Sequence, residues 1–235
     1  MPRFGYDAAV IARFPTIAGG VIEATGIRNG PTGPELRRAF DAEAAAARER
    51  IGGTPLSELP TLAAWRRAFR GFGVDPTQYR SAAEALLRRL TRQGDLPSIN
   101  TLVDIANLVS VRYALPVAVF DQRRVIGGTT VRFATGDEPW RDLGASSTEH
   151  PEPGEVIFVD DTGDVSARRW CWRQSAASAA RDDTTHVLVT VEGHHVSAPV
   201  DVAAALADLE ELLSVHTGAT IVRQAILGAA SPALE

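Results

Sequence analysis

Residues 96–134 read LPSINTLVDIANLVSVRYALPVAVFDQRRVIGGTTVRFA, and this stretch decides the fold of the chain. Its pattern predicts a helix, a short buried strand, a Gly-Gly turn and a second strand. In the helix, Asn100, Asp104 and Asn107 recur at i, i+4 and i+7, so they share one face. Because Asn and Asp are poor formers of helix interiors, we expect each of them to satisfy a specific hydrogen-bond need. These residues are candidates for one wall of a pocket.

The motifs of this stretch follow a characteristic order. I-N-x-x-V-D-x-x-N-x-V spans 99–109, P-x-x-x-F-D spans 116–121, and G-x-x-x-V-R-x-A spans 127–134, with Gly136 and Glu138 after it. An arginine-rich helix that ends in glycine precedes them at 86–94. Over residues 79–195 the pattern resembles the editing domain of the phenylalanyl-tRNA synthetase beta subunit, its third and fourth modules together. The resemblance implies the fold of that domain and an activity on aminoacyl-tRNA.

The order of predicted elements indicates the fold class. Helices gather early in the chain and strands late, which favours an α+β fold with a mixed sheet and flanking helices. Residues 1–78 are expected to form a mostly helical appendage packed on the core. Residues 79–235 are expected to form the editing-like domain, within a single compact unit overall.

Composition narrows the class of protein. At 235 residues, with 45% hydrophobic and 23% charged residues, the chain is typical of globular proteins. We find no signal-peptide core and no apolar run of the roughly 20 residues that span a bilayer. Cys171 is the single cysteine, which excludes a disulfide framework and a cysteine-based zinc site. We expect a cytoplasmic protein with no membrane partner, no metal and no cofactor, and the oligomeric state stays open.

The basic residues are unevenly placed. All 24 are arginine, and the net charge is -5. Residues 61–92 hold seven arginines against Asp75 and Glu84. Such a local patch fits contact between tRNA phosphates and Arg88, Arg89 and Arg92. The alternative is a pair of amphipathic helices whose arginine faces are solvated.

The string Arg169-Trp-Cys-Trp-Arg-Gln174 is the most unusual local feature. As part of a strand over 165–172, it would place Trp170, Trp172 and Gln174 on one face and arginines on the other. Aromatic rings beside guanidinium groups are typical of a binding wall for a base or an amino-acid side chain. The alternative is a core strand with arginines at its edge.

The resemblance assigns further residues. The string 169–174 stands where the synthetases have a glycine-rich segment that lines the editing pocket, and Ala118 stands where they carry a histidine. Thr185 and Glu192 resemble a T-(six)-E pair whose glutamate reads the misacylated side chain. We therefore take Trp170, Trp172, Thr185 and Glu192 as substrate-binding candidates. Adjacent His194 and His195 point apart on a strand and lack a third ligand, so we favour a turn over a metal site.

An aminoacyl ester is already activated, so a held water and hydrogen-bond donors suffice for its hydrolysis. Asn100, Asn107, Arg173 and Gln174 are the candidate catalytic groups. The favoured function is trans-acting hydrolysis of a mischarged aminoacyl-tRNA by a freestanding relative of the editing domain. One alternative is a non-catalytic module that binds tRNA or an amino acid. Another is a hydrolase or sensor for a small amino-acid ester or amide.

Overall fold

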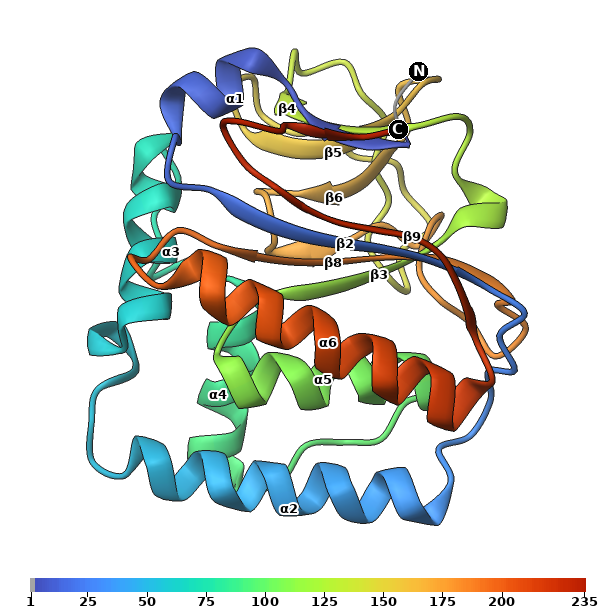
Figure 1. Ribbon diagram of the computed structural model, residues 1–235. Helices are drawn as coiled ribbons and strands as arrows, with labels where there is room; N and C mark the ends of the chain where they lie inside the picture. The colour runs from blue at the N-terminus through green and yellow to red at the C-terminus, as the bar shows by residue number, and fades with distance from the viewer. Residues whose placement is uncertain (1–2) are drawn as a thin grey trace.

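The computed structural model describes residues 3–235, and it stacks one β-sheet above another with the longest helices below the lower sheet (Figure 1). The strands are β1 (Phe4–Tyr6), β2 (Ala18–Thr25), β3 (Val117–Asp121), β4 (Thr129–Phe133), β5 (Val156–Asp160), β6 (Val165–Arg168), β7 (Arg173–Gln174), β8 (His186–Gly193), β9 (Thr220–Leu227) and β10 (Ala233–Leu234). The helices are α1 (Ala8–Arg13), α2 (Pro34–Ile51), α3 (Pro60–Gly71), α4 (Ala82–Gln93), α5 (Thr101–Tyr113) and α6 (Ala198–Thr217), with short 3₁₀ turns η1 (Leu56–Glu58) and η2 (Gln122–Arg124).

The two sheets differ in strand direction. One has the order β3-β8-β2-β9 and is antiparallel throughout. The other has the order β10-β1-β4-β5-β6-β7 and contains one parallel pair, β1 with β4. The predicted α+β class with a mixed sheet and flanking helices is therefore confirmed.

The stretch 96–134 folds in the predicted order. Asn100 caps α5 by accepting a hydrogen bond from the Val103 backbone N–H at 3.0 Å. After β3, the chain turns at Gly127, which has a φ of +73° and leads into β4. A Cβ at Gly127 would lie 2.0 Å from Asp161 Oδ2, so both conformation and space require glycine there.

The four-stranded sheet separates two cores. Along β8, Val187, Val189 and Val191 pack toward α2, α5 and α6. Leu188 alternates with them and packs in the other core, between the sheets. Thr190 and Glu192 share the face of Leu188, because strand side chains alternate with a period of two. The valines thus pack against the helices, and the side chains on the opposite face of β8 face the space between the two sheets.

The N-terminal residues do more than form helices. β2 pairs along its length with both β8 and β9, and β1 pairs with β4 and β10. Residues 3–78 therefore supply strands to both sheets in addition to the helices expected of an appendage. The division of the chain into residues 1–78 and 79–235 remains a prediction. Strands β9 and β10 had no counterpart in the sequence reading.

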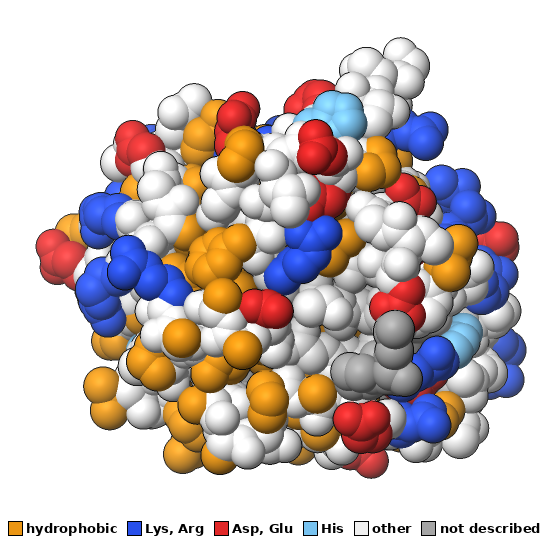
Figure 2. Space-filling view, turned by 90° about the horizontal axis from the view of Figure 1, so that it is seen from above, with side chains coloured by type: hydrophobic (Ala, Val, Ile, Leu, Met, Phe, Trp, Pro, Cys, Tyr) orange, Lys and Arg blue, Asp and Glu red, His pale blue; other side chains and the backbone are white. Residues whose placement is uncertain are grey.

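The surface above the six-stranded sheet carries arginine and acidic side chains interspersed with hydrophobic ones (Figure 2).

Within residues 3–235, none of the helices combines the length and the apolar character that crossing a bilayer requires.

Candidate active site

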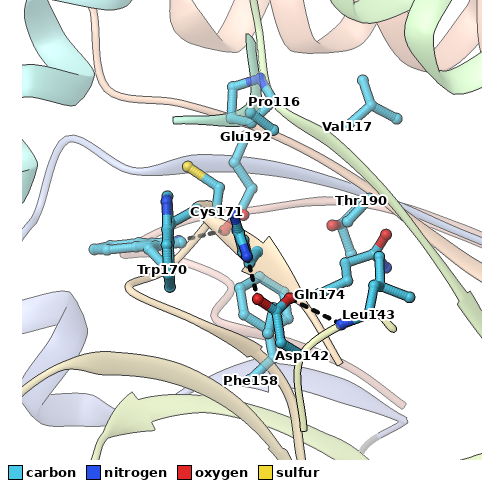
Figure 3. A pocket seen from close by; sticks show the side chains of 15 residues that line it. Pro116, Val117, Asp142, Leu143, Phe158, Trp170, Cys171, Gln174, Thr190 and Glu192 are labelled. Carbon is cyan, nitrogen blue, oxygen red and sulfur yellow. Dashed lines mark hydrogen bonds and ion pairs between the residues drawn. The ribbon is translucent and has the colours of Figure 1, made fainter. Parts of the chain in front are cut away.

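A cavity of about 450 Å³ lies between the two sheets (Figure 3). Strands β3 and β8 form one wall, β5 and β6 form the opposite wall, and the turn after β6 closes the side. The lining residues are Ala82, Pro116, Val117, Ala118, Asp142, Leu143, Phe158, Ala167, Trp170, Cys171, Trp172, Arg173, Gln174, Thr190 and Glu192. Of the predicted site residues, the fold brings Trp170, Trp172, Arg173, Gln174 and Glu192 together here.

The turn that follows β6 replaces the strand predicted over 165–172. β6 ends at Arg168, and both Arg169 (φ +44°) and Trp170 (φ +58°) adopt the left-handed conformation. That conformation is costly for residues with a side chain, so the surroundings must hold it. The Trp170 N–H donates to Val156 O at 2.6 Å, and Arg169 pairs with Glu155 at 3.0 Å. The expected alternation of faces is wrong, because the backbone turns instead of continuing as a strand.

Glu192 is the buried carboxyl of the cavity. Its Oε1 accepts hydrogen bonds from Tyr6 Oη at 2.7 Å and from Trp170 Nε1 at 3.0 Å, the latter drawn in Figure 3. Burial raises the pKa of Glu192 to about 7, although these two donors favour the carboxylate. The group is therefore poised between its neutral and charged forms near neutral pH.

Tyr6 is a site residue that the sequence reading missed. It reaches Glu192 from β1 across β2, and it does so because residue 19 is glycine. A Cβ at Gly19 would lie 2.0 Å from Tyr6 Oη. A glycine inside an apolar strand signals a close approach of this kind. Gly19 thus indicates in the sequence that another group approaches the strand closely, but it does not indicate that this group is Tyr6.

The other polar groups at the cavity are held by protein contacts. Gln174 Nε2 donates to Val119 O at 2.9 Å, which fixes the orientation of the amide. Arg173 pairs with Asp142 at the edge of the cavity. Burial raises the pKa of the Cys171 thiol well above its usual value, so the thiol stays protonated. Such a thiol is a poor nucleophile.

The helix face predicted to line the pocket lies elsewhere. Asn100 is the N-cap of α5, and Asp104 accepts hydrogen bonds from Thr32 Oγ1 at 2.6 Å and from the Ile99 N–H at 3.0 Å. Asn107 is half-buried on the same helix. Since α5 packs on the valine side of the four-stranded sheet, it faces away from the cavity. None of these residues is among the lining residues, so the structure gives them no contact with the cavity.

The Thr185–Glu192 pair is also separated. Thr185 is exposed just before β8, whereas Glu192 lies near the other end of that strand. Residues an odd number of positions apart on a strand point to opposite faces. Thr190, two residues before Glu192, takes the place at the cavity wall.

Replacing Asn100 by alanine tests this assignment. Loss of the cap is expected to lower the free energy of unfolding by about 0.5–2 kcal/mol. Binding of a ligand in the cavity should keep its affinity, because Asn100 contacts α5 and not the lining residues. Urea denaturation and ligand titration on the same protein measure both. Weakened binding at unchanged stability would return Asn100 to the site.

A basic groove of about 520 Å³ adjoins the cavity. It is lined by Gln78, Tyr79, Arg80, Ala85, Arg88, Arg89, Arg92, Gln93, Trp172 and Arg173. The three arginines predicted to bind tRNA therefore lie together in one groove. Trp172 and Arg173 line both the groove and the cavity, so the two spaces meet at these residues.

The two adjacent histidines occupy the turn between β8 and α6. His194 is buried against Trp65 and Trp170, and burial lowers its pKa to about 3. His195 Nε2 lies 2.7 Å from Asp201 Oδ2. In the part of the chain that the structure describes, no group of three His, Cys, Asp or Glu side chains is arranged to hold a metal ion.

Comparison with known proteins defines the family. The family model described as B3/4 domain matches residues 64–207, more than half of the chain. The chain therefore belongs to the B3/4 domain family, and the resemblance inferred from the sequence is confirmed.

Individual relatives agree with this assignment. The phenylalanine--tRNA ligase beta subunit of Bradyrhizobium diazoefficiens is 36% identical over 106 residues, which are 45% of this chain and 13% of the relative. That of Nocardia farcinica is 34% identical over 113 residues, 48% of this chain and 12% of the relative. The chain thus matches only a small part of the length of these curated relatives.

A solved structure has a similar fold. It is an N-terminal fragment of the phenylalanyl-tRNA synthetase beta subunit from Pyrococcus horikoshii, with a TM-score of 0.50 and 12% sequence identity. The match covers 95% of this chain and 53% of the fragment.

Proposed function

We propose that this chain binds the aminoacylated 3′ end of a tRNA in the cytoplasm and hydrolyses the ester of a mischarged amino acid. One observation carries the proposal: the cavity that contains the buried Glu192 opens beside an arginine-lined groove, and Trp172 and Arg173 belong to both. A charged tRNA end has the matching parts, because a small amino-acid ester is joined to a polyanionic strand. Membership of the B3/4 domain family supports the same substrate class.

The cavity provides the groups that hydrolysis of an activated ester requires. The oxygen of a water molecule attacks the ester carbonyl carbon, the bond from that carbon to the ribose oxygen breaks, and a proton passes to the ribose oxygen. Free amino acid and uncharged tRNA are the products. In its ionised form Glu192 accepts a proton from the attacking water, and its pKa of about 7 suits that role at neutral pH.

Two further side chains act on the substrate. Gln174, whose amide is fixed by Val119 O, and the Thr190 hydroxyl supply polar contacts for the amino-acid moiety. The apolar walls formed by Phe158 and Trp170 exclude water from all but the attacking position.

A second candidate function is binding without catalysis. It is favoured by Ala118, which stands at the cavity where the resemblance places a histidine. In addition, the described lining residues include no histidine, serine or lysine. In this alternative the cavity holds the aminoacyl group and protects the ester.

Deacylation of a panel of mischarged tRNAs by the purified protein tests the proposal. We expect hydrolysis of at least one aminoacyl ester, and a loss of about 100- to 10,000-fold in rate for Glu192→Gln, the usual range of general-base contributions. Arg38→Gln, on the exposed face of α2 and outside both cavities, is the control and should retain the full rate. Binding of the charged tRNAs without hydrolysis of any ester would favour the second candidate.

A further inference from the structure

The groove beside the cavity combines aromatic rings, amides and cations in one space. Tyr79 and Trp172 supply the rings, Gln78 and Gln93 supply amides, and five arginines line the rest. Among the described lining residues no side chain is acidic. Its volume of about 520 Å³ lies within the range of roughly 300–1,000 Å³ that small-molecule sites occupy.

The aromatic wall of the groove is built before any ligand arrives. The guanidinium carbon of Arg169 lies 3.9 Å from the ring centroid of Tyr79 and 4.7 Å from that of Trp172. The two rings are themselves 5.0 Å apart, edge to face. Arg169 is held in turn by Glu155 at 3.0 Å. Arg173 lies over Trp172 at 4.8 Å and adds a planar cationic surface at the junction with the cavity.

The cations of the groove are largely free to bind an anion. Within residues 3–235, Arg88 and Arg92 make no ion pair, and Arg89 has only the exposed Asp95 at 3.7 Å. The Nε of Arg80 is buried, donates no hydrogen bond to a described residue and lies 3.9 Å from Glu84 Oε1, so this arginine is paired. Most other arginines at the site are paired, as Arg169 and Arg173 are. Arg88, Arg89 and Arg92 are therefore available to phosphate oxygens, for which guanidinium groups are well suited.

The cationic lining continues beyond the groove. A third cavity, of about 490 Å³, is also lined by Arg80, Arg88 and Arg92, together with Arg66 and with Glu84, whose carboxylate pairs with Arg66 and Arg80. The same three arginines thus border two neighbouring spaces, and the inter-sheet cavity adjoins the first of them through Trp172 and Arg173. This arrangement provides a path in which one base can pack against aromatic rings and several phosphates can lie beside arginines.

We propose that the groove is a nucleotide subsite for single-stranded RNA. The base packs against Tyr79 and Trp172, and the phosphates follow Arg88, Arg89 and Arg92 toward the third cavity. The orientation of the bound strand rests on the proposed function, because the 3′-terminal ribose that carries the ester must point into the inter-sheet cavity. Trp172 and Arg173 stand where the sequence resemblance places a glycine-rich segment, so this aromatic wall is a feature of this chain's own sequence.

The test uses uncharged RNA, which makes it independent of ester hydrolysis. Fluorescence anisotropy is measured with a labelled single-stranded RNA ending in CCA and with a blunt duplex of the same length. We expect the single strand to bind more tightly. Tyr79→Leu, which keeps an apolar side chain beside Arg169, should weaken binding by about 5- to 100-fold, as expected for the loss of one stacked base. Tyr79→Phe retains the ring and should bind like the unchanged protein.

Salt dependence tests the phosphate contacts. Replacing Arg88, Arg89 and Arg92 by glutamine should reduce the slope of log affinity against log salt by about 2, because each contact to a single strand contributes about 0.7. The matched control replaces Arg28, Arg38 and Arg67, which are exposed and line neither basic space. Circular-dichroism melting of every variant excludes unfolding as the cause.

The outcomes separate this inference from the proposed function. Equal binding of the blunt duplex, or unchanged binding by Tyr79→Leu, would overturn the nucleotide subsite and leave only a phosphate-binding surface. Undiminished deacylation by a Tyr79→Leu protein would also overturn it while the proposed function stands. Binding of the single strand with the expected losses, but no hydrolysis of any ester, would support the subsite and contradict the hydrolytic function.

Discussion

Replacement of Trp170 by alanine is expected to lower the free energy of unfolding by about 3–5 kcal/mol. Its side chain is fully buried and packs edge to face against Phe14, Trp65 and His194. Alanine would leave a large void among these rings, and the rigid sheets limit how far they can close it. The substitution also removes the indole donor to Glu192. Urea denaturation followed by far-ultraviolet circular dichroism measures the change.

Two neighbouring substitutions calibrate this expectation. Trp170→Phe keeps most of the ring volume but loses the indole donor, so it should cost less than the alanine variant. Trp172→Ala removes a half-buried ring at the cavity edge and should also cost less. A loss below about 0.5 kcal/mol for Trp170→Ala would contradict the packing described here, since such values are typical of surface substitutions.

Glu192 is expected to make stability depend on pH. Its pKa is raised by burial from 4.5 to about 7, so between these values the folded protein keeps a proton that the unfolded chain has lost. The contribution of Glu192 is therefore fully present below pH 4.5 and is lost as the pH rises through 7. A shift of this size corresponds to about 3 kcal/mol. Glu192→Gln does not titrate, and it retains an oxygen that can accept from Tyr6 and Trp170.

The measurement is the difference in unfolding free energy between Glu192→Gln and the unchanged protein from pH 4.5 to 8. The variant should become relatively more stable by about 3 kcal/mol across this range. A difference that stays flat with pH would show that the carboxyl is hydrated and ionised throughout.

Glu23→Gln is the control of opposite sign. Burial alone would raise the pKa of Glu23, but hydrogen bonds from Arg3, His186 and Arg223 outweigh it and lower the pKa to about 2. Its stabilising contribution is present above 4.5 and is lost as the pH falls toward 2. This variant should therefore be destabilised at neutral pH and approach the unchanged protein in acid.

Features set by neighbours in the chain were predictable. The Asn100 cap, the Ser81 cap that accepts from the Glu84 N–H, and the glycine turn at Gly127 follow from local hydrogen bonding and backbone sterics. The order helix, strand, turn and strand over residues 96–134 was predictable for the same reason. The family resemblance rested on this local order, and the family model confirms it.

Parts of the site depended on the register and direction of strands. The family resemblance paired Thr185 with Glu192, but the parity of β8 brings Thr190, and not Thr185, to the cavity wall beside Glu192. The local sequence pattern also predicted a strand through Arg169 and Trp170. The structure instead has a left-handed turn there, which is held by contacts with Val156 and Glu155. Local conformational propensity could not predict these contacts, because it takes no account of residues elsewhere in the chain.

The sequence by itself thus determined the α+β class, the family and the arginine-rich helix whose side chains gather in one groove. Only the tertiary structure decided which residues surround the cavity and in which ionisation state Glu192 lies. The physical reason is that burial and hydrogen bonding arise from residues far apart in the chain. Tyr6 meets Glu192 across 186 positions, and that contact exists only when both sheets are assembled around Gly19.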